Sequence, residues 1–137
     1  MKRLVTRLQQ RQQQLRLTTR AQRRLHERVL TAVMLTLTRG TLADALTLGP
    51  RRHVVLALTE ERVWILDHAW PGTVGGVIAD FGRGGTLLHA RRSPLARHHA
   101  IELSWPDSHG FVAGTIPASE AADLLIGHLA ADELTHR

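Results

Sequence analysis

The clearest pattern along the chain is a pair of short apolar runs, HVVLALT (53–59) and RVWILD (62–67). Continuous apolar runs of this length are typical of strands that are buried on both faces or packed in a small barrel. Glu60 and Glu61 separate the runs by the length of a two-residue hairpin loop. Loops of that length prefer Asn-Gly or similar pairs, so a longer turn that includes Thr59 fits equally well. The pattern predicts two neighbouring strands joined by an acidic turn.

The same two glutamates are the first candidates for catalysis, because a pair of carboxylates can serve as acid and base. A working pair needs a fixed mutual geometry and usually shielding from water. Adjacent side chains at a turn instead diverge into solvent. We therefore interpret Glu60 and Glu61 as turn residues that keep the hairpin tip soluble.

Further apolar segments, separated by turn signals, continue to residue 116. Gly75-Gly76 inside one of them predicts a bulge or a sharp bend, and GRGG (82–85) predicts a hairpin loop. Strands with a turn about every 8–12 residues favour a small antiparallel sandwich or barrel. The predicted strands are VGGVIADF (74–81), TLLHARR (86–92), HHAIELSW (98–105) and HGFVAGTI (109–116), with further turns at Pro71-Gly72 and Pro106-Asp107-Ser108.

The segment before these strands is ambiguous. Residues 29–38, VLTAVMLTLT, fit either the end of a helix or a first strand, and their scattered threonines and β-branched residues favour a strand. Arg39-Gly40 is predicted to end that strand, and Gly49-Pro50 is predicted to form a turn.

The C-terminal segment predicts a helix. Ala122, Leu125, Ile126 and Leu129 recur at the spacing of one helical face. Pro117 is tolerated in a first turn, and Ser119 is a suitable capping residue.

Positive charge is concentrated at the N-terminus. Residues 1–28 carry nine basic residues against Glu27 alone, a charge of +8, whereas the remaining 109 residues carry −2. This segment has no Gly or Pro and is rich in Arg, Gln and Leu, all good helix formers. Its apolar stripe is interrupted by polar residues, so we predict a weakly amphipathic basic helix and not a coiled coil.

The order of elements, about seven strands followed by one amphipathic helix, resembles the pleckstrin-homology (PH) superfold and, within it, the bacterial PH-like domains. The stretch ALTEERVWIL (57–66) carries the resemblance most clearly, because an apolar strand ends in Leu-Thr, an acidic turn follows, and Arg opens another apolar strand. IPASEAADLLIGHL (116–129) is similar to the closing helix of the family. The resemblance covers about residues 27–134.

The resemblance implies an α+β, mainly β fold: a half-open barrel of about seven antiparallel strands in two nearly orthogonal sheets, closed by the C-terminal helix. The chain would then divide into a basic N-terminal helix (1–26) and a PH-like domain (27–137). The resemblance also implies a binding module without catalytic residues. Eukaryotic relatives often bind phosphoinositides near the loop between the first two strands, here about 39–52, which offers Arg39, Arg51 and Arg52. The spaced lysine-and-arginine signature of those relatives is absent, so looser attraction of anions is the expectation.

No motif predicts an enzyme, a metal or a cofactor. The chain has no cysteine, and its serines lie in no GxSxG elbow. The glycine-rich stretch is followed by neither GKS nor GKT. His98 and His99 are adjacent, so in a strand their rings point to opposite faces. The histidines at 53, 68, 89 and 109 could converge only through the fold.

The basic helix is therefore the strongest functional candidate. We expect a non-enzymatic module whose helix contacts an anionic lipid surface or an acidic protein, with binding to nucleic acid as the alternative. A further possible partner is a second copy of the chain, paired through the same helix. A helix that projects with free arginines would favour recruitment, and a docked helix would favour a structural role. The predicted contact residues are Arg3, Arg7, Arg11, Arg16, Arg20, Arg23 and Arg24, together with Arg39, Arg51 and Arg52.

The expected cellular location follows from the length of the apolar runs and from the composition of the N-terminus. None reaches the ~18 residues of a spanning helix, and residues 1–14, MKRLVTRLQQRQQQ, show no apolar signal core. We expect a cytoplasmic protein that can bind a membrane peripherally.

Overall fold

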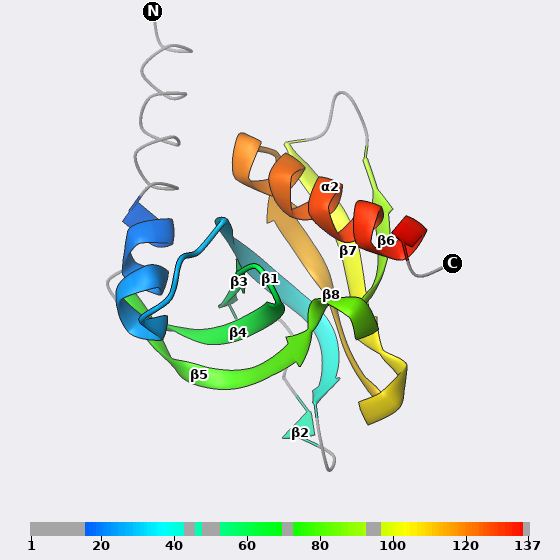
Figure 1. Cartoon of the computed structure of the whole chain (residues 1–137), viewed down its shortest axis with the longest axis horizontal. Coiled ribbons are helices and arrows are strands. Elements are labelled where there is room, and N and C mark those ends of the chain that lie inside the picture. Colours follow the sequence, from blue (N-terminus) through cyan, green and yellow to red (C-terminus); the bar gives the residue numbers. More distant parts are fainter. Residues whose placement is uncertain (1–15, 43–45, 48–52, 70–72, 93–96, 136–137) are drawn as a thin grey trace, which may run out of the picture.

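The computed structural model describes residues 16–42, 46–47, 53–69, 73–92 and 97–135 (Figure 1). A helix over residues 16–25 precedes a set of antiparallel strands, and a second helix ends the chain. The elements are β1 (Thr31–Leu42), β2 (Leu46–Thr47), β3 (His53–Leu58), β4 (Arg62–Ala69), β5 (Thr73–Gly82), η1 (Arg83–Gly85), β6 (Leu87–Arg91), β7 (His98–Trp105), η2 (Pro106–Ser108), β8 (Gly110–Pro117) and α2 (Glu120–Thr135).

The strands form one antiparallel sheet in the order β5-β4-β3-β1-β8-β7-β6, with the short β2 paired to β1. β1 pairs with β3 on one side and with β8 on the other, so it belongs to both halves of the sheet. β5 and β6 lie at the two ends and do not pair with each other. The sheet is therefore not closed, which confirms the predicted half-open, PH-like barrel with helices before and after it.

The connection from β5 to β6 differs from the prediction. GRGG was expected to be a hairpin loop, but its residues form η1 and join the two opposite ends of the sheet. The prediction was wrong because a glycine-rich turn shows where the chain bends, whereas strand pairing depends on partners elsewhere in the sequence.

Residues 29–38 were predicted to be either the end of a helix or a first strand. The structure shows a strand, because β1 covers Thr31–Leu42. Arg39-Gly40 does not end it, because Arg39 pairs with Ala113 and Gly40 with Val112. The predicted break is instead a register shift between Leu37 and Arg39. Pairing with β8 on one side keeps this glycine-containing stretch extended.

The acidic turn is confirmed. The backbone N–H of Thr59 donates to the carbonyl of Arg62 at 3.0 Å, so the turn includes Thr59. Glu60 and Glu61 are both exposed. The bulge predicted at Gly75-Gly76 is also present, since the pairing of β4 with β5 shifts across these residues.

The core lies inside the barrel and is closed by α2. The predicted apolar face of α2 is buried there, and Ser119 caps the helix by accepting from the backbone N–H of Ala122 at 3.1 Å. Each fully buried leucine or isoleucine contributes about 1.5–3 kcal/mol, so α2 is an integral part of the fold. Pro117 is not in the first turn, because it still pairs with His98 at the end of β8. The α2 residues in the core are Ala121, Ala122, Leu125, Ile126 and Leu129.

Candidate functional site

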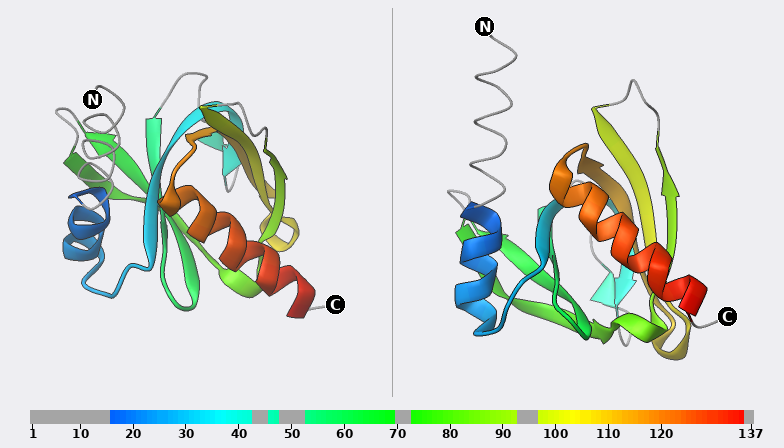
Figure 2. Two further views of the ribbon diagram at one scale, coloured as in Figure 1. Left: turned by 90° about the horizontal axis from the view of Figure 1, so that it is seen from above. Right: turned by 45° about the horizontal axis from the view of Figure 1, so that its top comes forward.

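The N-terminal helix packs on the outer face of the sheet, opposite the face that α2 covers. Ala21 is fully buried, and Leu17 and Leu25 are partly buried beside it. In Figure 2 this helix (blue) lies beside the sheet, away from α2 (orange to red). Together these apolar side chains hold the helix to the body. The sheet residues beneath them are Ala32 of β1, Val55 and Ala57 of β3, Trp64 and Leu66 of β4, and Val74 of β5.

The end of the helix is tied to the body by local hydrogen bonds. The N–H of His26 donates to the carbonyl of Gln22 at 2.9 Å, and His26 takes a left-handed conformation with φ of 55°. The Gln22 side-chain oxygen accepts from the N–H of Val29 at 3.2 Å. The N–H of Leu30 then donates to the carbonyl of Leu58 at 2.7 Å. The helix is thus connected to the start of β1 through a short, bonded turn.

Most of the arginines in the described part of this helix face solvent. Arg16, Arg23 and Arg24 are exposed, and so is Arg28 in the turn that follows. Arg20 is half-buried and has an interaction partner. The described part of the helix therefore docks on the sheet, the arrangement expected to favour a structural role, while these arginines stay exposed; Arg24 itself reaches over Gly76 of β5. Arg3, Arg7 and Arg11 lie outside the described residues.

Of the arginines predicted around the first loop, Arg39 is described, and it is not brought to the helix. Arg39 lies within β1, eight residues beyond Thr31, which is about 26 Å along an extended strand. Its guanidinium carbon is 5.7 Å from the centre of the Phe111 ring. Arg51 and Arg52 lie outside the described residues. Arg39 therefore does not belong to the group of positive charges on the N-terminal helix.

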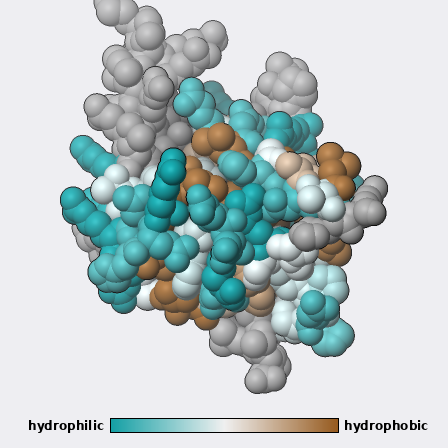
Figure 3. All heavy atoms as spheres, in the orientation of Figure 1, coloured by the Kyte–Doolittle hydropathy of each residue, from teal (hydrophilic) through white to brown (hydrophobic). Residues whose placement is uncertain are grey.

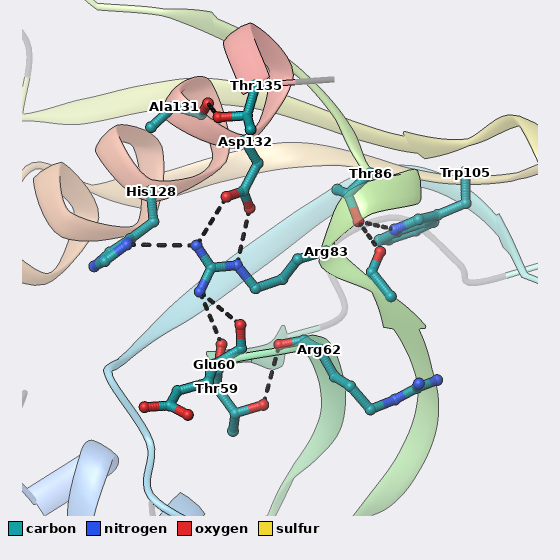
Figure 4. Close-up of polar contacts among 11 residues, drawn as sticks. Thr59, Glu60, Arg62, Arg83, Thr86, Trp105, His128, Ala131, Asp132 and Thr135 are labelled. Carbon is teal, nitrogen blue, oxygen red and sulfur yellow. Dashed lines mark hydrogen bonds and ion pairs between the residues drawn. The ribbon is translucent and has the colours of Figure 1, made fainter. Parts of the chain in front are cut away.

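Arg83 is the most highly connected charged side chain of the described residues, and sequence reasoning missed it. Its guanidinium binds Asp132 of α2 through two contacts, Nε to Oδ2 at 2.8 Å and Nη2 to Oδ1 at 3.0 Å (Figure 4). Nη1 donates to the carbonyls of Thr59 and Glu60, both at 3.1 Å. Arg83 thus joins η1, the β3–β4 hairpin and α2. No local pattern marks it, because Asp132 lies 49 residues later.

A second set of contacts lies beside Arg83 and stabilises the same corner. The indole N–H of Trp105 donates to Thr86 Oγ1 at 2.7 Å, and that hydroxyl donates to the carbonyl of Gly82 at 2.9 Å. The Phe81 and Trp105 rings stack with their centres 3.9 Å apart. These polar groups are occupied by one another, so we assign them a structural role.

Two of the histidines converge in the fold. The rings of His53 and His68 are 6.0 Å apart, and His53 Nδ1 is 3.1 Å from Thr36 Oγ1. Among the described residues no group of three or more His, Cys, Asp or Glu side chains could hold a metal ion. His98 is exposed and His99 is buried, which confirms that their rings point to opposite faces.

Comparison of the chain with family models, with curated proteins and with solved structures found no match. Within the described part of the chain, neither helix has the length and apolar character needed to cross a membrane.

Proposed function

We propose that the chain is a non-enzymatic PH-like binding module and that its basic N-terminal helix contacts an anionic lipid surface. The observation that carries the proposal is that the helix docks through apolar side chains while its arginines stay exposed. Leu17, Ala21 and Leu25 are used in docking, whereas Arg16, Arg23 and Arg24 remain exposed.

A docked helix was expected to favour a structural role, but the exposed arginines leave it available for binding as well. A docked helix holds its charges in one orientation, so binding does not have to order the helix first. Because the apolar face of residues 16–25 packs on the sheet, this part of the helix has no apolar stripe left to insert into lipid. Contact through this segment is therefore electrostatic, and each arginine near an anionic surface contributes about 1 kcal/mol.

Nucleic acid is the alternative that uses the same charges. Residues 16–28 contain no Phe, Trp or Tyr, the side chains that give the largest stacking surface for a base. A lipid surface needs only an array of positive charge, so these residues meet its requirements more fully. An acidic protein would use the same arginines. An assay with protein-free vesicles distinguishes binding to a lipid surface from binding to such a protein.

The test is sedimentation of the full chain with vesicles of phosphatidylcholine mixed with phosphatidylserine, compared with phosphatidylcholine alone. We expect binding only to the mixed vesicles, and weaker binding as salt rises. The variant R16Q/R23Q/R24Q should partition about 100-fold less, from three lost charges of about 1 kcal/mol each. The matched variant R16K/R23K/R24K keeps the charge and should retain most of the binding.

Two results would contradict the proposal. One is that the full chain does not sediment with the mixed vesicles at low salt. The other is a variant R16Q/R23Q/R24Q that binds as tightly as the original chain. A gel shift of duplex DNA at low salt, without vesicle binding, would favour the nucleic-acid alternative.

A further inference from the structure

The end of the β6–β7 hairpin carries a second group of exposed arginines. Arg91 is the last residue of β6, Arg92 follows it, Arg97 lies just before β7, and all three are exposed. The segment 89–99 contains no acidic residue. This hairpin end is therefore a compact source of positive charge that lies far from the N-terminal helix in sequence.

Strand register brings this hairpin end to the end of the strands at which β1 begins, just after the basic helix. The helix leads into the start of β1, which runs antiparallel to β8, with Thr36 opposite Thr115. The end of β8 therefore lies beside the first half of β1. Pro117 at that end pairs with His98 at the start of β7, and Ala100 pairs with Arg91 at the end of β6.

The start of α2 contacts both the start of β1, which follows the basic helix, and the hairpin end. On one side, Thr31 Oγ1 at the start of β1 donates to the carbonyl of Ala121 at 2.9 Å. On the other side, the N–H of Ala118 donates to the carbonyl of Arg97 at 2.8 Å. In the right view of Figure 2 the start of α2 (orange) appears between the N-terminal helix (blue) and the upper ends of strands β6 and β7.

Carboxylates in this region reduce the positive charge but do not cancel it. Asp123 of α2 lies 3.7 Å from Arg92, measured from Oδ1 to Nη1, and both side chains are largely exposed. Glu120 has an interaction partner. Glu60 and Glu61 add two charges at the nearby β3–β4 turn, and Glu27 adds one after the helix. The opposing set of arginines is larger: Arg16, Arg20, Arg23, Arg24, Arg28, Arg91, Arg92 and Arg97.

We propose that the β6–β7 hairpin end is a second contact with the anionic lipid surface, so that Arg91 and Arg97 bind headgroups together with the basic helix. This inference rests on the proposed function of that helix. Two basic groups linked through the start of α2 suit a broad, nearly flat array of negative charge. Figure 3 shows that much of one face of the molecule is hydrophilic, with apolar residues in smaller patches.

Two-point contact has a consequence that the helix alone lacks. Once one group is bound, the other is held near the surface, and its binding no longer requires a separate encounter. Arg91 and Arg97 should therefore contribute to affinity even though neither belongs to the N-terminal segment. Residues 16–28 and 89–99 contain no Phe, Trp or Tyr, which disfavours extensive base stacking by a nucleic acid.

The test is the same sedimentation assay with the full chain and substitutions at the hairpin only. R97Q should weaken binding to the phosphatidylserine vesicles about five-fold, and R91Q/R97Q should weaken it at least about tenfold. R39Q removes the same charge from a position far along β1 and should leave binding unchanged. R91K/R97K should bind as the original chain does. Arg92 is left in place because Asp123 lies beside it.

The outcomes separate this inference from the function on which it rests. If the original chain binds and R91Q/R97Q binds equally well, the second contact is refuted and the helix proposal stands. If R39Q weakens binding as much as R97Q, the effect reflects total charge, and the second contact is again refuted. If the original chain does not bind these vesicles, both proposals fail. Matching thermal unfolding curves for all variants would show that changes in binding do not arise from misfolding.

Discussion

Arg83 binds Asp132 through both nitrogens of one edge of its guanidinium, at 2.8 and 3.0 Å, and so fixes the β5–β6 connection to α2. The side chains are only 13% and 23% exposed, which distinguishes this pair from the Arg62–Asp80 pair at 44% and 36%. Arg83 also donates to two carbonyls of the β3–β4 turn. One side chain therefore holds together three elements that close the barrel.

Replacing Arg83 with methionine should lower the free energy of unfolding by about 2–3 kcal/mol. The substitution removes charged hydrogen bonds in a shielded site and leaves Asp132 and two carbonyls without a donor. R62M removes a more exposed pair and should cost less than about 1 kcal/mol. Urea unfolding of the two variants measures the difference. Equal losses would show that the Arg83 network is no stronger than a surface ion pair.

Gly114 lies where β8 approaches β1 most closely. A Cβ at this position would be 2.1 Å from the carbonyl oxygen of Thr36, so the backbone would have to move. We expect G114A to destabilise the fold by about 3 kcal/mol. Gly127 is an exposed glycine of α2 with open space around it, and G127A should stabilise by about 0.5–1 kcal/mol through better helix propensity. Thermal unfolding should give opposite signs for these two Gly→Ala changes.

Ala21 is the fully buried contact of the N-terminal helix with the sheet. A21E would place a carboxylate against the apolar outer face and should undock the helix, with a loss of about 2 kcal/mol. Because the Val29 amide donates to Gln22, its hydrogen exchange should become much faster in this variant. T19E changes an exposed residue of the same helix and should leave the exchange of Val29 slow. Slow exchange in A21E would mean that docking does not depend on this contact.

His99 is 8% exposed, and its Nδ1 has no hydrogen-bond partner among the described residues. A buried polar atom without a partner costs free energy, and an apolar side chain of similar size removes that cost. We expect H99L to be neutral or to stabilise by up to about 1 kcal/mol in urea unfolding. H98L, on the exposed face of the same strand, should have little effect. A clear loss of stability in H99L would show that the imidazole is hydrogen-bonded in solution.

Local features of the fold were predictable because they depend on neighbouring residues. Continuous apolar runs on either side of Glu60-Glu61 indicated two strands and their turn, which the structure confirms. The Ser119 cap and the apolar face of α2 followed from spacing along one helix. The bulge at Gly75-Gly76 followed from the missing side chains of a glycine pair.

Features that depend on distant partners were not predictable in the same way. Arg39 is kept in a strand by β8, more than 70 residues later in the chain. GRGG joins the two ends of the sheet and does not form a hairpin, because its flanking strands pair with other neighbours. The ion pair of Arg83 with Asp132 likewise joins residues that share no local pattern.

The sequence by itself determined the separation of charge, +8 in residues 1–28 against −2 in the rest, and the order of strands and closing helix. Only the tertiary structure decided that the helix docks through Ala21 while Arg23 faces solvent, and that Arg97 lies at the end of the strands where β1 begins. Charge and periodicity are properties of the chain read in order. Docking and register depend on which apolar surfaces and backbone groups can be satisfied together in space.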